Sequence, residues 1–215
     1  MNFLAHGYRY LDQPYVVAGV AVPDWLTVVD RKIRAKSKYA EPMLLSDDEA
    51  TREIAWGIMQ HHRDDLWFHN SRIFNETMLQ FAIELRDQLP GDEGFRPSFL
   101  GHILVEILID ATLLEREPSL GERYYAAVEA VSPEKVEAVV NQMTQHETRG
   151  LAPLISRFAA ARFLYDYLEN DKLLMRLNQV MTRVGLPLLS QGLTPWLTQA
   201  RRVVGQRCDS LLMPS

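Results

Sequence analysis

The chain has a single cysteine, Cys208, among its 215 residues. One thiol cannot close a disulfide within the chain, so a disulfide framework is excluded, and a reducing compartment is the natural setting. The opening residues, MNFLAHGYRY, also lack the basic leader and apolar stretch of a secretory signal. We therefore expect a cytoplasmic protein.

Excess positive charge and long apolar runs are missing as well. Lysine and arginine number 23 against 28 acidic residues, which gives a net charge of −5 and no basic stripe for nucleic acid. No segment reaches the roughly 18 consecutive apolar residues of a membrane-spanning helix. We expect neither a nucleic-acid nor a membrane partner, and the sequence leaves the oligomeric state open.

Strand patterns are also absent, because no alternating run of β-branched residues is bounded by tight-turn dipeptides. Apolar residues recur instead at helical spacing, so we expect an all-α fold. Without an internal repeat or a Gly/Ser linker, residues 1–215 are predicted to form a single-domain helical bundle, with the chemistry-bearing motifs within residues 1–115 and C-terminal helices over 119–207. The first helix is expected at about 2–11, and the second begins near residue 16 with an interruption at Pro23. The third runs from Ser46 to Asn70 or Ser71, the fourth continues from there to Leu89, and the fifth begins at Ser98. Further helices are expected at about 121–131, 133–147, 154–169, 171–184 and 187–207.

Helix-start signals set several of these boundaries. Ser46 with Glu49 three residues later is typical of a capping box. Ser98, after Pro97, is expected to cap the next helix, and the intervening PGDEGFRPS has the proline and glycine of a loop.

The most informative segment runs from His102 to Leu114, HILVEILIDATLL. It is apolar on nearly every side, yet His102, Glu106 and Asp110 recur at intervals of four, which places them along one stripe of a helix. Burying a carboxylate costs several kcal/mol, so two carboxylates on an apolar helix need a compensating charge. A metal ion would supply that charge.

A second stripe lies upstream in IAWGIMQHHRDDLWFHN, where His61, Asp65 and His69 again recur at intervals of four. Imidazole and carboxylate together suit Mn, Fe, Ni or Zn. Alone, each histidine would be read as a core or surface residue; two stripes on apolar helices favour a metal site. Whether His62, His69 and His102 are themselves ligands stays open, and Asp64 is expected to be a solvated neighbour of Asp65.

Several other chemistries lack their sequence signatures. The chain has no Glu-x-x-His pair of a ferritin-like di-iron bundle and no cysteine pairs of structural zinc. It also has no glycine-rich phosphate loop and no G-x-S-x-G nucleophile turn.

The order of these motifs resembles that of the acyl carrier protein phosphodiesterases. MNFLAH resembles the opening of that family, and AGVAVPDW its small-residue segment ending in an aspartate and an aromatic residue. GIMQHHRDDL resembles the family's G-I-x-x-H-x-R-x-D segment, and LVEILIDATL resembles its apolar helix with two acidic residues four apart. The matching positions in these two segments are Gly57, Ile58, His61, Arg63, Asp65, Glu106 and Asp110.

The resemblance covers residues 1 to about 115 and becomes faint beyond, and it has departures. Glu106 stands where the family has an aspartate, and Ala111 where it has a histidine. His62 replaces a second basic residue, and His69 replaces an aspartate. These changes are compatible with an altered metal shell, an altered substrate or lost activity.

The resemblance implies an all-α fold like that of the HD-domain phosphohydrolases and a metal-dependent phosphodiesterase that releases 4'-phosphopantetheine from holo acyl carrier protein. Asp24 would orient the attacking water or take its proton, and Arg63 would pair with the phosphate. The cations of RKIRAKSK would either steer an acidic carrier protein or only keep a solvated loop soluble. The implied metal ligands are His6, Asp24, His61, Asp65, Glu106 and Asp110.

Two alternatives remain. The same metal site would also suit a nucleotide or another small phosphoester, as in the wider HD class. The second alternative is a non-catalytic helical binding protein. In it, the histidines and carboxylates form a buried polar network without metal.

Overall fold

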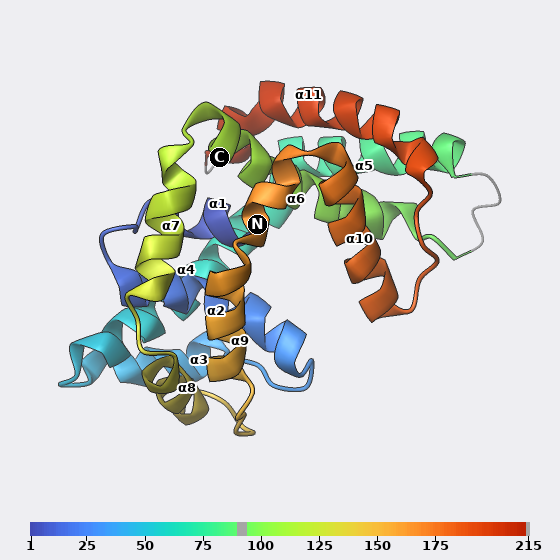
Figure 1. Cartoon of the computed structure of the whole chain (residues 1–215). Coiled ribbons are helices and arrows are strands. Elements are labelled where there is room, and N and C mark those ends of the chain that lie inside the picture. The colour runs from blue at the N-terminus through green and yellow to red at the C-terminus, as the bar shows by residue number, and fades with distance from the viewer. Residues whose placement is uncertain (90–93, 214–215) are drawn as a thin grey trace. The chain divides into compact units, whose positions relative to one another are not determined.

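The computed structural model describes residues 1–89 and 94–213, and the described chain is built from helices and the turns between them (Figure 1). No strand occurs in these two ranges. The all-α prediction is therefore confirmed. Four residues of the predicted PGDEGFRPS loop, 90–93, lie outside the described residues.

The helices divide into two compact units, which we name by their central helices. The α2 unit comprises Phe3–Leu66 and Ser119–Arg162, and the α6 unit comprises Met1–Asn2, Trp67–Pro118 and Phe163–Ser215. The expectation of a single domain stays a prediction. The α2 unit contains α1 (Phe3–Gly7), α2 (Pro14–Val29), α3 (Ser37–Ala40), the 3-10 helix η1 (Glu41–Leu45), α4 (Glu49–Asn70) as far as Leu66, α7 (Ser119–Glu129), α8 (Pro133–Gln142) and α9 (Leu151–Ala161). The α6 unit contains the end of α4, α5 (Arg72–Gln88), α6 (Pro97–Arg116), η2 (Phe163–Leu168), α10 (Asn170–Val184), η3 (Gln191–Leu193) and α11 (Thr194–Leu211).

In the α2 unit, two glycines let α2 and α4 touch backbone to backbone. A Cβ added to Gly19 would lie 2.6 Å from the carbonyl oxygen of Ile54, and one added to Gly57 would lie 2.7 Å from that of Val16. No side chain fits there. One residue beyond Gly19 is Val20, and one turn beyond Gly57 is His61, so this contact brings the His61 ring to the Val20 carbonyl oxygen at 2.8 Å.

We expect Gly57→Ala to destabilise the protein by about 1–3 kcal/mol, because its methyl group forces two helix backbones apart. Thermal unfolding by circular dichroism measures the change. The matched control is Gly205→Ala in α11, where an added Cβ meets nothing within 4 Å and helix propensity favours alanine. Equal melting temperatures for Gly57→Ala and the unmutated protein would contradict the close helix contact.

In the α6 unit, α6 is the core helix. It is 20 residues long with mean hydropathy 1.5, and by length and composition alone it could cross a membrane, although His102, Glu106 and Asp110 interrupt its apolar run. However, 72% of that stretch is buried within the protein. Packing therefore accounts for its apolar composition: Gly101 lets α6 approach α5, since a Cβ there would lie 2.8 Å from the Met78 carbonyl oxygen.

Helix α4 begins at Glu49, about one turn after the predicted start at Ser46. Asp48, and not Ser46, caps the helix, because its carboxylate accepts a hydrogen bond from the Thr51 backbone N–H at 2.9 Å. The same carboxylate forms an ion pair with Lys135 Nζ at 2.9 Å. Hydrogen bonds from Thr51 and Lys135 lower the pKa of Asp48 to about 2. Ser46 instead accepts from the Asp48 N–H at 3.2 Å, which fixes the turn before the helix.

Helix α2 runs through Pro23 without the predicted interruption, because the helix's other hydrogen bonds and its buried apolar face hold it together. Helix α6 begins at Pro97, so Ser98 lies inside its first turn, and its N-cap residue is Arg96 in the left-handed region (φ 51°) with no side-chain cap. The predicted helix over 154–169 is divided at Arg162 (φ 43°) into α9 and η2.

The remaining boundaries differ at helix ends. The first helix is shorter than 2–11, α7 begins and ends two residues earlier than predicted, α8 ends at Gln142, and the predicted helix over 187–207 becomes η3 followed by α11. The break predicted at Asn70 or Ser71 is confirmed, because Ser71 caps α5; Ser132 caps α8, and Gly185 ends α10 at φ 72°.

Candidate metal centre

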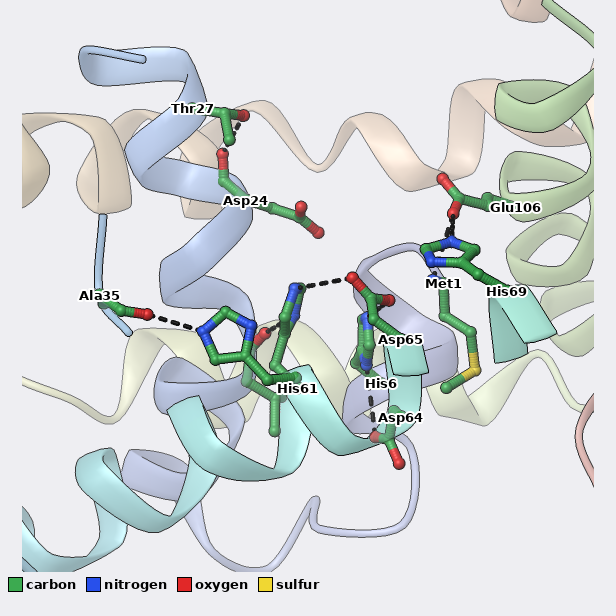
Figure 2. A network of polar contacts seen from close by, with 12 residues as sticks. Met1, His6, Asp24, Thr27, Ala35, His61, Asp64, Asp65, His69 and Glu106 are labelled. Atoms are coloured by element: carbon green, nitrogen blue, oxygen red, sulfur yellow. Dashed lines mark hydrogen bonds and ion pairs between the residues drawn. The ribbon is translucent and has the colours of Figure 1, made fainter. Parts of the chain in front are cut away.

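In the α2 unit, His6 from α1 meets His61 and Asp65 from α4. Nε2 of His6 lies 3.3 Å from Oδ1 of Asp65, and Nε2 of His61 lies 3.3 Å from Oδ2 of the same carboxylate. The two imidazole rings stack with centroids 4.2 Å apart. Figure 2 shows the Asp65 carboxylate directed at both rings. The three ligand atoms all lie within 4.8 Å of one another, close enough to share one ion.

The other nitrogen of each ring sets its tautomer. His61 Nδ1 lies 2.8 Å from the Val20 carbonyl oxygen, which can only accept, so Nδ1 carries the proton. His6 Nδ1 lies 3.3 Å from Oδ2 of Asp64, and an ionised carboxylate likewise only accepts. In the neutral rings, both Nε2 lone pairs therefore face Asp65.

Two lone pairs against one carboxylate are unfavourable unless a cation lies between them or one or both rings take up a second proton. The side chain of His6 is fully buried, and its Nε2 has no hydrogen-bond partner within the described residues. Protonating both rings would place two positive charges about 4 Å apart, which costs about 4 kcal/mol at an effective dielectric constant of about 20. One shared divalent ion satisfies both nitrogens and the carboxylate without that repulsion.

The neighbouring rings also keep the Asp65 carboxylate ionised. Burial by itself would raise the pKa of Asp65, but the imidazoles of His6 and His61 outweigh burial and hold that pKa well below its usual range. Burial opposes protonation of His61, yet the Asp65 carboxylate raises the pKa of that ring above its ordinary value. Asp65 thus stays ionised, as a metal ligand must.

Asp24, on α2, lies beside this group. It is half-buried, and Figure 2 shows its carboxylate pointing toward the side chains of His61 and Asp65. Burial raises the pKa of Asp24, and the nearby rings of His61 and His6 oppose the rise. Asp24 is not within ligand distance of all three group members, so it is placed to bind a ligand of the ion or to move a proton.

The neighbours of these ligands take other roles. Asp64 was expected to be a solvated residue, which was wrong: it pairs with His6 and accepts a hydrogen bond from Gln60 Nε2 at 2.7 Å, so it orients the His6 ring. His62 is tied through Nε2 to the Ala35 carbonyl oxygen at 2.7 Å, and burial lowers its pKa. Arg63 is exposed, and helix geometry turns it away from the face that carries His61 and Asp65.

The α6 unit holds a second group around Glu106. Oε1 of Glu106 lies 2.9 Å from Nε2 of His69, 3.2 Å from Nε2 of His102 and 3.2 Å from the amino group of Met1. Burial would raise the pKa of Glu106, but the Met1 amino group and the rings of His102 and His69 together lower it well below its usual range. Glu106 therefore remains a carboxylate.

Asp110, predicted to be a metal ligand next to Glu106, lies outside this group. It is fully buried, and its Oδ2 accepts a hydrogen bond from Asn2 Nδ2 at 2.9 Å. Asn2 also reaches the Tyr167 hydroxyl at 3.5 Å. The structure thus accounts for this carboxylate through polar contacts within the α6 unit.

The donor set of the α2 unit fits a divalent transition metal. Two imidazole nitrogens and one carboxylate suit Mn, Fe, Ni or Zn, and the buried Nε2 of His6 without a hydrogen-bond partner among the described residues marks where such an ion would bind. His61 and Asp65 follow from their spacing on one helix. Spacing could not find His6, which joins them from another helix; only the resemblance of MNFLAH indicated it.

Comparison of the chain with protein-family models, with curated proteins and with solved structures found no match. What can be said of function therefore rests on the residues and their geometry.

Proposed function

We propose that the protein is a metal-dependent phosphoester hydrolase, related in fold to the HD-domain phosphohydrolases, that acts in the cytoplasm. The supporting observation is the group of His6, His61 and Asp65, in which two imidazole lone pairs converge on one buried carboxylate. Such a group suits a divalent cation, and the sequence signatures of the other chemistries considered are missing.

Each residue of this group would have a separate role in binding the ion or in catalysis. His6, His61 and Asp65 hold the ion, with Asp64 and the Val20 carbonyl oxygen fixing the two rings. When bound, a divalent ion lowers the pKa of a water molecule toward about 7 and polarises phosphoryl oxygens. Asp24, whose carboxylate points to this side of the group, orients the attacking water and accepts its proton.

The substrate we propose is holo acyl carrier protein, cleaved to apo carrier and 4'-phosphopantetheine. The resemblance of residues 1–115 to the carrier phosphodiesterases supports this substrate, as does the segment 31–38. Its side chains Arg31, Lys32, Arg34, Lys36 and Lys38 are all exposed, while Ile33 and Ala35 between them are buried. Because His62 holds the Ala35 carbonyl oxygen, the segment is anchored next to His61, where an acidic protein would dock.

Reversing two of these charges tests the docking. We expect Lys32→Glu with Lys36→Glu to raise KM for holo carrier about tenfold at low salt, with the difference disappearing in high salt, where charge interactions are screened. Turnover of a small phosphodiester is expected to be unchanged. The control pair Lys172→Glu and Arg202→Glu makes the same change in net charge at exposed positions of the α6 unit. Identical salt profiles for both pairs would exclude docking at segment 31–38.

A substrate panel tests the function itself. We expect protein loaded with Mn, Fe, Ni or Zn to release 4'-phosphopantetheine from holo carrier. Mass spectrometry of the carrier protein measures this release. Turnover of nucleotides or simple phosphodiesters without carrier turnover would favour a small-phosphoester hydrolase. Failure to bind any of these ions would leave the group as a polar network in a non-catalytic binding protein.

A further inference from the structure

The group around Glu106 offers three ligand atoms of its own. His69 comes from the end of α4, His102 and Glu106 from α6, and one nitrogen or oxygen of each lies within 4.8 Å of the others. Both imidazoles direct Nε2 at the same carboxylate, and their ring centroids are 4.8 Å apart. Two histidines and one carboxylate on neighbouring positions are the donor set of open-sited Fe(II) and of catalytic zinc.

One oxygen of the Glu106 carboxylate is available to bind an ion. The contacts from His69, His102 and the Met1 amino group all converge on Oε1. Oε2 of Glu106 has no hydrogen-bond or ion-pair partner in the ranges 1–89 and 94–213. Glu106 can therefore hold the amino group through Oε1 and accept an ion through Oε2.

The two rings are free to present lone pairs to such an ion. Within the described chain, Nδ1 of His69 and Nδ1 of His102 have no hydrogen-bond partner, so each can carry the ring proton and face solvent. The side chains of His69 and His102 are 33% and 38% exposed, whereas Glu106 is 17% exposed. Water thus reaches the histidine side of the group, where an ion would keep open coordination positions.

We infer that His69, His102 and Glu106 form a second, open transition-metal site, separate from the proposed site of His6, His61 and Asp65. The ion is divalent and borderline in softness, and Zn²⁺, which imidazole and carboxylate ligands bind readily, is the probe for the site. The inference does not depend on phosphoesterase activity, because it concerns metal binding by the α6 unit alone.

The experiment counts Zn²⁺ ions in the full chain by elemental analysis after dialysis, using variants that remove one site at a time. We expect about two ions in the unmutated chain, about one in His61→Ala, about one in His102→Gln and none in the double variant. Co²⁺ titration of His61→Ala is expected to give one set of visible d–d bands, which His102→Gln or Glu106→Gln removes. Loss of a direct ligand should weaken binding at least as much as the 10- to 100-fold typical of supporting residues.

Controls separate site loss from other causes. His146→Gln changes an exposed histidine outside both groups and should leave the count at two. Circular dichroism on His102→Gln checks that the α6 unit is folded, and Glu106→Gln provides a second variant if it is not. An unchanged count in folded His102→Gln and Glu106→Gln would overturn the second site. One ion lost in these variants but none in His61→Ala would support it while contradicting the proposed hydrolase centre.

Discussion

Asp65→Asn is expected to abolish both metal binding and turnover. The substitution keeps the side-chain volume but removes the negative charge of the carboxylate that lies 3.3 Å from the Nε2 atoms of both His6 and His61. Without that charge, an ion beside two imidazoles has no compensating ligand. Losing a metal ion withdraws several kcal/mol of transition-state stabilisation, which corresponds to a fall in kcat/KM of about a thousandfold or more. Elemental analysis and carrier-cleavage assays on the same preparation measure the two effects.

Asp47→Asn makes the same chemical change at an exposed residue of the same unit and should alter neither metal content nor turnover. Asp64→Asn tests the orienting contact to His6 and should weaken metal binding by about 10- to 100-fold without removing the ion at saturating concentration. Full metal content in Asp65→Asn would contradict the assignment of Asp65 as a ligand.

Asp24→Asn is expected to lower kcat by about 100- to 10,000-fold while the protein keeps its ion, because general-base catalysis contributes that much and Asp24 is not one of the three converging ligands. Asparagine preserves the shape of the side chain and cannot accept the proton. Single-turnover assays with metal-loaded protein measure the chemical step.

The control for this variant is Asp12→Asn, a carboxylate with a 95% exposed side chain in the same unit, which should behave like the unmutated protein. Loss of the ion together with activity in Asp24→Asn would show that Asp24 is a metal ligand instead of a base. Turnover within twofold of the unmutated protein would contradict both roles.

Helical periodicity predicted the fold class and the pairing of His61 with Asp65, because both are consequences of the 3.6-residue repeat. The same repeat bears on why Asp110 is not among the ligand atoms that converge with His102 and Glu106. Four residues turn a helix through 400°, so each step of four rotates by about 40°, and eight residues rotate by about 80° and rise about 12 Å. Asp110 is therefore rotated by about 80° from His102 along the helix, although it is no further from Glu106 in sequence than His102 is.

Contacts made across helices could not be predicted in the same way. His69 meets Glu106, and His6 meets Asp65, from different helices, and the sequence carries no signal for the rotation of one helix against another. The glycine pair at positions 19 and 57 is the one local clue, since it marks the close approach that sets His61 against α2. Helix ends were missed where capping used a residue that the motif did not name, as Asp48 does in α4.

The most direct test of the account is ¹⁵N NMR of the histidine side chains with and without Zn²⁺. We expect His6 and His61 to carry their protons on Nδ1 and to show a metal-induced shift at Nε2 on loading, as the contacts to Asp64 and the Val20 carbonyl oxygen require. Protonated Nε2 atoms on both rings that do not respond to Zn²⁺ would contradict the metal centre and leave a hydrogen-bonded network in its place.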